Sequence, residues 1–142
     1  GQERVLVNCA GIAIGKRLVR RDRETGAISH HDLESYSRVI KINLIGTFTM
    51  MAKCAAGMVT LDPVGPDNER GVIISTASVA AEDGQIGQVA YSASKGGVQA
   101  MTLPVARKIA SLPSACPAIC SVIRRPCALR IWQAMVRFQI SS

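Results

Sequence analysis

The chain has 142 residues, room for one domain, and its 48% of hydrophobic and 19% of charged residues exclude a largely disordered chain. No apolar run approaches about 18 residues, and the N-terminus lacks the basic start and apolar stretch of a signal peptide, so a soluble protein without a membrane span is predicted. Five cysteines, an odd count without the spacing of a disulfide framework, favour reduced thiols in an intracellular protein.

The first predicted element is a strand over residues 4–8, a short apolar run rich in valine. Residues 9–28 follow as a loop that approaches a candidate site and then becomes basic. Ser29 and Asp32 form an S-x-x-D capping box, which predicts a helix that runs to about Val59. His30 and His31 are then polar residues of the first helical turn.

The second half of this predicted helix is apolar on more than one face. Such a helix is either deeply buried or shared with a partner. The residues responsible are Leu44, Ile45, Phe48, Met50 and Met51.

A turn-rich surface loop is predicted over residues 62–70, followed by a strand at 71–75, a continuous apolar run of the kind that is covered on both faces. Ser78 lies just past the carboxyl end of that strand, and in open α/β sheets ligands bind at this edge. The next helix carries Tyr91 near its start, and Pro104 would strain it near its end.

Tyr91 and Lys95, in the segment YSASK, are spaced to share one helix face one turn apart. A free phenol has a pKa of about 10 and is a poor base at neutral pH, so proton transfer needs a nearby cation that favours the phenolate. Lys95 supplies that charge in this interpretation, and Ser78 hydrogen-bonds the substrate oxygen. Taken alone, a Y-x-x-x-K pattern more often marks an ordinary surface turn.

Four features occur in one order along the chain: Asn8-Cys9-Ala10-Gly11 after a strand, Asn43 in a helix, Ser78 after the next strand, and Tyr91 with Lys95 on the next helix. In this order they resemble the short-chain dehydrogenase/reductase family. The segments RGVIISTASVAA and GQIGQVAYSASKGGVQAMTLPVAR look most like its type 2 3-hydroxyacyl-CoA dehydrogenases. The resemblance covers roughly residues 3–110.

The resemblance implies an incomplete α/β, Rossmann-like fold with a doubly wound parallel sheet. It also implies an oxidoreductase that interconverts a secondary alcohol and a ketone with a nicotinamide cofactor, NAD in the first instance with NADP left open. Tyr91 would be the general acid/base, Ser78 would orient the substrate oxygen, and Lys95 would also bind the nicotinamide ribose. Asn43 would hold a water that links Lys95 to solvent. The cofactor-binding set would be Asn8, Ala10, Gly11, Tyr91 and Lys95.

Two departures from the family pattern limit this interpretation. The sequence contains no TGxxxGxG turn, the glycine-rich segment that binds pyrophosphate at a helix N-terminus, so the chain is expected to be partial and to begin at the fourth strand. After Arg107 the sequence departs from the family pattern, and no Pro-Gly turn follows. We therefore divide the chain into residues 1–110, expected to be the central part of a short-chain dehydrogenase domain, and residues 111–142, expected to be a divergent basic tail of non-homologous origin.

The formal charge of +7 is carried entirely by residues 84–142, because every acidic residue lies at or before Asp83. A nucleic-acid or membrane contact by the tail is the competing explanation, but its arginines are scattered and no nucleic-acid partner is predicted. The basic loop over residues 16–23 could meet the phosphates of a coenzyme A ester, although exposed and solvated charges are the commoner case. No metal site is predicted from Cys116, Cys120, His30 and His31.

Two functions therefore remain open. The first is a 3-hydroxyacyl-CoA dehydrogenase or a related enzyme, acting on an acyl-CoA ester or another small secondary alcohol, homo-oligomeric at full length, and cytoplasmic or mitochondrial. The alternative is an inactive fragment that associates through the helices around residues 31–59 and 91–108. For the fragment alone, poor stability is expected, because a cut sheet exposes an apolar edge.

Overall fold

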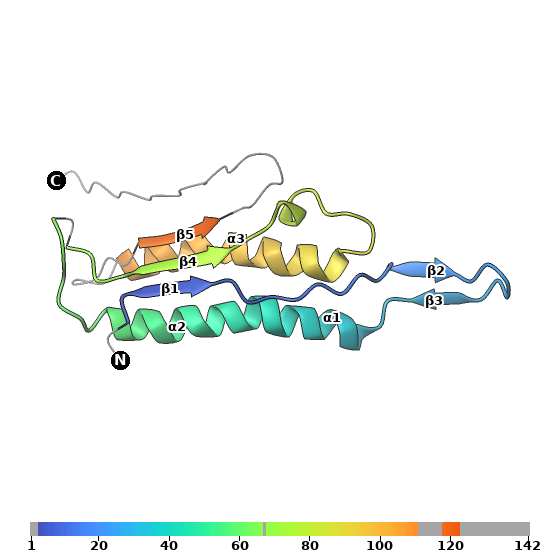
Figure 1. Ribbon diagram of the computed structural model, residues 1–142, viewed down its shortest axis with the longest axis horizontal. Coiled ribbons are helices and arrows are strands. Elements are labelled where there is room, and N and C mark those ends of the chain that lie inside the picture. Colours follow the sequence, from blue (N-terminus) through green and yellow to red (C-terminus); the bar gives the residue numbers. More distant parts are fainter. Residues whose placement is uncertain (1–2, 67, 111–117, 123–142) are drawn as a thin grey trace.

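The computed structural model describes residues 3–66, 68–110 and 118–122, arranged around a small parallel sheet (Figure 1). Its strands are β1 (Val5–Asn8), β4 (Val72–Thr76) and β5 (Ala118–Val122), in the order β1-β4-β5. The register pairs Val5 with Val72 and Val72 with Ala118, and both pairings are parallel. The two strands predicted from apolar runs are confirmed to within one residue, whereas β5 was not predicted and lies in the segment set apart as a tail.

The connection between β1 and β4 contains one long helical run, formed by α1 (Leu33–Ile40), the π-helical turn η1 (Lys41–Ile45) and α2 (Gly46–Met58). The predicted end near Val59 is confirmed, because Val59 is the C-cap. The predicted capping box is wrong. Asp32 is itself the N-cap and accepts a hydrogen bond from the Ser35 amide at 2.7 Å, which satisfies one of the free amides of the first turn.

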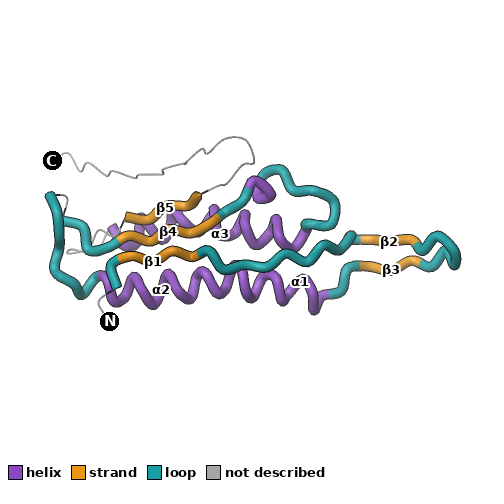
Figure 2. Tube along the Cα trace, viewed as in Figure 1, coloured by secondary structure: helices purple, strands orange, loops and turns teal. Residues whose placement is uncertain are grey.

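A two-stranded antiparallel hairpin, β2 (Val19–Arg21) and β3 (Ile28–His30), occupies the region predicted as a loop and the start of a helix. Ser29 and His30 therefore lie in a strand, and His31 precedes the N-cap, so neither histidine is in the first helical turn. Figure 2 shows the hairpin extending from one end of the molecule, beyond α1. All six hairpin strand residues are exposed.

The core lies between the sheet and the helices on one of its faces. Met51 and Met58 of α2 pack with Ile73 of β4, and all three are at most 1% exposed. α3 (Val89–Ala110) closes this layer and contributes Ile109. On the other face of the described sheet, Val5 and Val7 are 62% and 50% exposed. The predicted Rossmann-like α/β class is confirmed, and the described residues contribute one helical layer of it.

The helical run Leu33–Met58 has 26 residues and contains an 18-residue window with a mean hydropathy of 1.3, so by length and composition alone it would pass for a membrane span. Core helices of soluble proteins pass the same test, and this run buries polar Asn43 and Thr47 against its neighbours. The expectation of a chain without a membrane span stays a prediction.

Candidate active site at the carboxyl edge of the sheet

Helix α3 brings Tyr91 and Lys95 to one place, as their spacing predicts. Tyr91 is the third residue of the helix, and Lys95 follows one turn later. The Lys95 ammonium lies 5.9 Å from the centroid of the Tyr91 ring, and the lysine residue is only 6% exposed. A charged side chain so well covered needs polar partners.

Those partners come from the last residue of β4. The Lys95 Nζ donates a hydrogen bond to the Thr76 carbonyl oxygen at 2.7 Å and lies 3.3 Å from the Thr76 hydroxyl oxygen. Burial lowers the pKa of Lys95, and the electrostatic influence of Cys9, just past β1, acts in the opposite direction. The ammonium is thus held at the carboxyl edge of the sheet, where strand ends and α3 meet.

Ser78 lies two residues beyond β4 and caps the short 3₁₀ helix η2 (Val79–Ala81). Its hydroxyl oxygen accepts a hydrogen bond from the Ala80 amide at 3.2 Å. Because the Ser78 hydroxyl oxygen is the acceptor in that bond, the Ser78 hydroxyl proton takes no part in it. Among the described residues, Ser78 and Tyr91 make no direct hydrogen bond to each other, so the structure places them on adjoining segments without joining them.

Asn43 is fully buried in the π-helical turn, and its side chain binds both backbone groups of Ile12. The Oδ1 atom accepts from the Ile12 amide at 2.8 Å, and Nδ2 donates to the Ile12 carbonyl at 2.8 Å. The same Nδ2 donates to Ser94 Oγ at 3.1 Å, and this hydroxyl donates to the Tyr91 carbonyl at 2.7 Å. Asn43 therefore connects the loop after β1 to the helix of Tyr91. Its proposed role in holding a water stays a prediction.

The predicted cofactor-binding residues after β1 lie beside this network. Asn8 joins β1 to β4, because its Nδ2 donates to Ser75 Oγ at 3.2 Å. Ala10 and Gly11 are exposed. A Cβ at Gly11 would lie 3.3 Å from Asn43 Oδ1 and 3.8 Å from Lys95 Nζ, so glycine lets the backbone approach both side chains. These small, exposed residues leave the backbone uncovered beside the Lys95 ammonium, and their binding of a cofactor stays a prediction.

Two residues of this site were missed by the sequence analysis. Thr76 and Ser94 both occur in the segments that carry the family resemblance, yet neither received a role. The sequence offers only a weak signal for them, because Ser94 adjoins Lys95 and Thr76 lies two residues before Ser78, and serine and threonine are common near strand ends.

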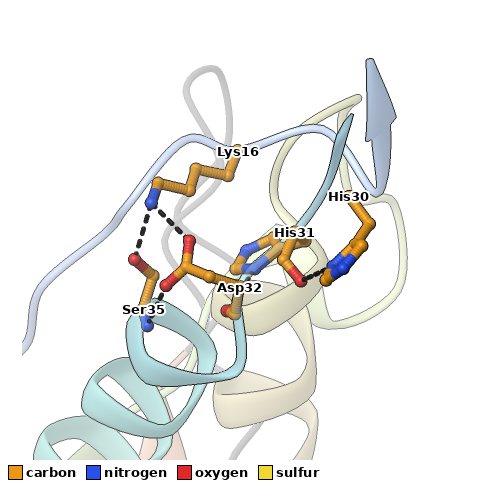
Figure 3. Close-up of polar contacts among 5 residues, drawn as sticks. All are labelled: Lys16, His30, His31, Asp32 and Ser35. Carbon is orange, nitrogen blue, oxygen red and sulfur yellow. Dashed lines mark hydrogen bonds and ion pairs between the residues drawn. The ribbon is translucent and has the colours of Figure 1, made fainter. Parts of the chain in front are cut away.

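A second polar cluster fixes the base of the hairpin to α1 (Figure 3). The Lys16 ammonium forms an ion pair with the Asp32 carboxylate and donates to Ser35 Oγ at 2.9 Å. The hydrogen bond from Lys16, followed by those from Ser35, lowers the pKa of Asp32 well below its ordinary value. The Lys16 amide also donates to the Gly87 carbonyl at 3.0 Å, so this cluster reaches the loop that leads into α3.

Two cavities of the described residues lie away from the predicted site. One, of about 310 Å³, lies between α2 and α3 and has an almost entirely apolar lining that includes Phe48 and Pro104. Another, of about 510 Å³, is formed by the hairpin turn, residues 21–26. Within the described residues, no group of three or more His, Cys, Asp or Glu side chains could hold a metal ion.

The fold and the site together define a class. Residues 2–121 match the family described as short chain dehydrogenase, and the chain belongs to this family. It is 48% identical over 112 residues to 3-hydroxyacyl-CoA dehydrogenase type-2 of Bos taurus, covering 79% of this chain and 41% of the relative. To the protein of the same name from Mus musculus it is 49% identical over 110 residues, covering 78% of this chain and 40% of the relative.

The structural comparison agrees. A crystal structure of 3-hydroxyacyl-CoA dehydrogenase type-2 from Mycobacterium avium superposes with a TM-score of 0.71 at 33% identity, covering 87% of this chain and 44% of that chain. The predicted family resemblance is therefore confirmed. The chain spans about two fifths of the length of the curated relatives it matches.

Proposed function

We propose that this site interconverts a secondary alcohol and a ketone, with a 3-hydroxyacyl-CoA ester as substrate and NAD as cofactor. The observation that carries the proposal is the buried Lys95 ammonium, held by Thr76 at the carboxyl edge of the sheet and 5.9 Å from the Tyr91 ring. In this proposal the ammonium is the electrostatic partner of the tyrosine hydroxyl. The names of the relatives support the acyl-CoA substrate class.

Each side chain has a role in this proposal. Tyr91 donates a proton to the ketone oxygen during reduction and accepts it from the alcohol during oxidation. Ser78 donates its free hydroxyl proton to the same oxygen and stabilises the charge that develops there. Lys95 stabilises the phenolate and binds the ribose of the cofactor, which supplies or accepts the hydride when bound. Asn43 keeps the loop after β1 against the helix of Tyr91, and it would also hold the water beside Lys95.

Cofactor binding decides between NAD and NADP. Asn8, Ala10 and Gly11 would line the nicotinamide half of the site with Tyr91 and Lys95, and none of these contacts distinguishes the two cofactors. Titration of the 142-residue chain with NADH and with NADPH, followed by calorimetry, is the direct measurement. Tighter binding of NADPH would replace NAD in the proposal.

The catalytic proposal is tested with two tyrosine variants. Hydride transfer to acetoacetyl-CoA is followed at the nicotinamide absorbance for the parent chain, Tyr91→Phe and the matched control Tyr36→Phe. Tyr36 lies in α1 with its ring edge-on to His31, 6.2 Å between the ring centroids. Removal of its hydroxyl therefore measures the general effect on the fold of a tyrosine-to-phenylalanine substitution. We expect Tyr91→Phe to lose activity by a factor of at least about 100 and Tyr36→Phe to keep it. Equal activity of both variants would refute the role of Tyr91.

A second function is favoured by the outer face of α2. Phe48 and Met50 are 52% and 45% exposed on either side of the buried stripe of α2, and Phe48 lines the apolar cavity between α2 and α3. The chain would then act, if at all, through association of these helices, and in a full-length protein the same face would build a homo-oligomer. Light scattering that shows a dimer or larger species without cofactor binding would favour this alternative over catalysis.

The remaining expectations are proposals of the same kind. We place the protein inside the cell, in the cytoplasm or the mitochondrion. Cys9 and Cys54 are free thiols, in keeping with a reducing compartment. We also propose that the protein has no nucleic-acid partner and no membrane span. The division at residue 110 also stays a proposal. Most of residues 111–142 lies outside the described residues, although the family match extends to residue 121.

A further inference from the structure

Thr76, the last residue of β4, makes hydrogen-bond contacts to two other segments of the chain. Its carbonyl and hydroxyl oxygens lie 2.7 Å and 3.3 Å from the Lys95 Nζ. Its hydroxyl also donates to the Asn8 carbonyl at 3.1 Å. Thr76 is thus the point at which β1, β4 and α3 meet.

The direction of the hydroxyl follows from its partners. A hydroxyl has one proton, and here the proton is directed to the Asn8 carbonyl, which can only accept. The lone pairs of the Thr76 oxygen are then left for Lys95, whose ammonium can only donate. The end of β1 therefore orients the hydroxyl that receives Lys95.

We propose that Thr76 is a positioning residue that holds the Lys95 ammonium at the edge of the sheet through its hydroxyl as well as its carbonyl. This inference rests on the proposed function, in which Lys95 supports the phenolate of Tyr91. Thr76 acts through Lys95 and makes no contact with the reacting atoms. Valine has the same shape without the hydroxyl, whereas serine keeps the hydroxyl without the methyl group, so the two substitutions separate the roles.

The titration of Lys95 reports this contact. The titratable groups that face its ammonium are Tyr91 on its own helix and the Cys9 thiol after β1. A hydroxyl that accepts from the ammonium favours its charged form, so removal of that hydroxyl should move the midpoint of the Lys95 titration further down. A purely structural role gives the opposite result, since a loosened Lys95 gains water and its midpoint rises toward the ordinary value.

Competitive acetylation between about pH 7 and pH 11, with mass spectrometry of the modified peptides, measures the midpoint for each lysine separately. Exposed Lys53 serves as the internal standard. In Thr76→Val we expect the midpoint of Lys95 to fall by about 0.5 to 1 pH unit, and in Thr76→Ser to stay within about 0.2 of the parent chain. An unchanged or raised midpoint in Thr76→Val, or an equal fall in Thr76→Ser, would overturn the proposal.

Thr76→Ala makes the test independent of how well the valine variant folds, because alanine also lacks the hydroxyl but has less bulk. The same downward shift supports the proposal, and its absence overturns it. The labelling uses neither cofactor nor substrate. A chain that fails to bind NADH but shows the shift would refute the dehydrogenase proposal and keep the positioning role of Thr76. A chain that binds NADH but shows no shift would keep the dehydrogenase proposal and refute the positioning role.

Discussion

Asn43→Ala is the substitution that tests the site most directly, because the side chain of Asn43 joins three chain segments. It makes hydrogen bonds to the Ile12 amide, the Ile12 carbonyl and Ser94, with distances between 2.8 Å and 3.1 Å, and the residue is 0% exposed. At about 1 kcal/mol for each bond, the loss is about 3 kcal/mol. Two backbone groups of Ile12 also lose their partner, which adds to the cost.

The matched control is Asn8→Ala. It removes the same kind of amide from the same region, but Asn8 is half-buried and its side chain makes one hydrogen bond, to Ser75 at 3.2 Å. We therefore expect a loss of about 1 kcal/mol in this variant. Urea unfolding followed by far-UV circular dichroism gives both values, provided that the slope with urea is unchanged.

Hydrogen exchange provides a local measurement of the same contact. The Ile12 amide is protected through Asn43, so peptides that contain residues 9–17 should exchange at least about ten times faster in Asn43→Ala than in the parent chain, and in Asn8→Ala much less so. If Asn43→Ala costs no more free energy of unfolding than Asn8→Ala, and the exchange of this loop does not change, the idea that Asn43 anchors the loop is refuted.

Two further predictions concern stability. The Asp32 carboxylate has a depressed pKa in the folded chain, so its contribution to the free energy of unfolding is present above the unfolded pKa of about 4 and is lost as the pH falls. The urea midpoint of the parent chain, measured from pH 7 to pH 3, should therefore fall. The midpoint of Asp32→Asn should fall less. A Cβ at Gly71 would lie 2.7 Å from the Arg4 carbonyl, so Gly71→Ala should destabilise the fold by about 1 to 3 kcal/mol, whereas the control Gly57→Ala, with nothing within 4 Å in α2, should stabilise it by up to about 1 kcal/mol. A stabilised Gly71→Ala or a pH-independent parent chain would contradict the respective argument.

Local patterns were sufficient for the parts of the fold that depend on neighbours in sequence. The apolar runs gave β1 and β4, and the spacing of four residues placed Tyr91 and Lys95 on one face of α3. Such signals work because the apolar residues of a strand, and side chains one helix turn apart, lie within a few residues of each other in the sequence.

The hairpin β2–β3 could not be predicted in this way. Its strands have three residues each and are exposed throughout, so no alternation of polar and apolar residues marks them. The turn does carry a signal, because Asp22 accepts from the amides of Glu24 and Thr25, and Gly26 has a φ of 72°. Asp and Gly in such positions are typical of a tight turn, but these residues lie within a run of charged residues, and the sequence analysis interpreted the whole run as a basic loop.

The contacts around Asn43 were beyond the reach of the sequence for a different reason. Asn43 and Ile12 lie 31 residues apart, and Lys95 and Thr76 lie 19 apart, so neither pair has a local pattern. The family resemblance supplied the site residues but not these connections. The structure adds that Asn43 and Lys95 bind backbone groups of the loop after β1 and of β4, and so depend on correct packing at this edge of the sheet.

The apolar surface of α2 leads to a last step of synthesis. Its sequence predicted a helix that is either deeply buried or shared, and the two possibilities differ in what covers Phe48 and Met50. Met51, Ala55 and Met58 form a buried stripe against the sheet, whereas Phe48 and Met50 remain about half exposed within the described part of the molecule. The described residues therefore do not bury the whole surface of this helix, and sharing with a partner stays a prediction. Phe48 also lines the cavity between α2 and α3, so in the association proposal its substitution by a charged residue should affect association before it affects the site around Lys95.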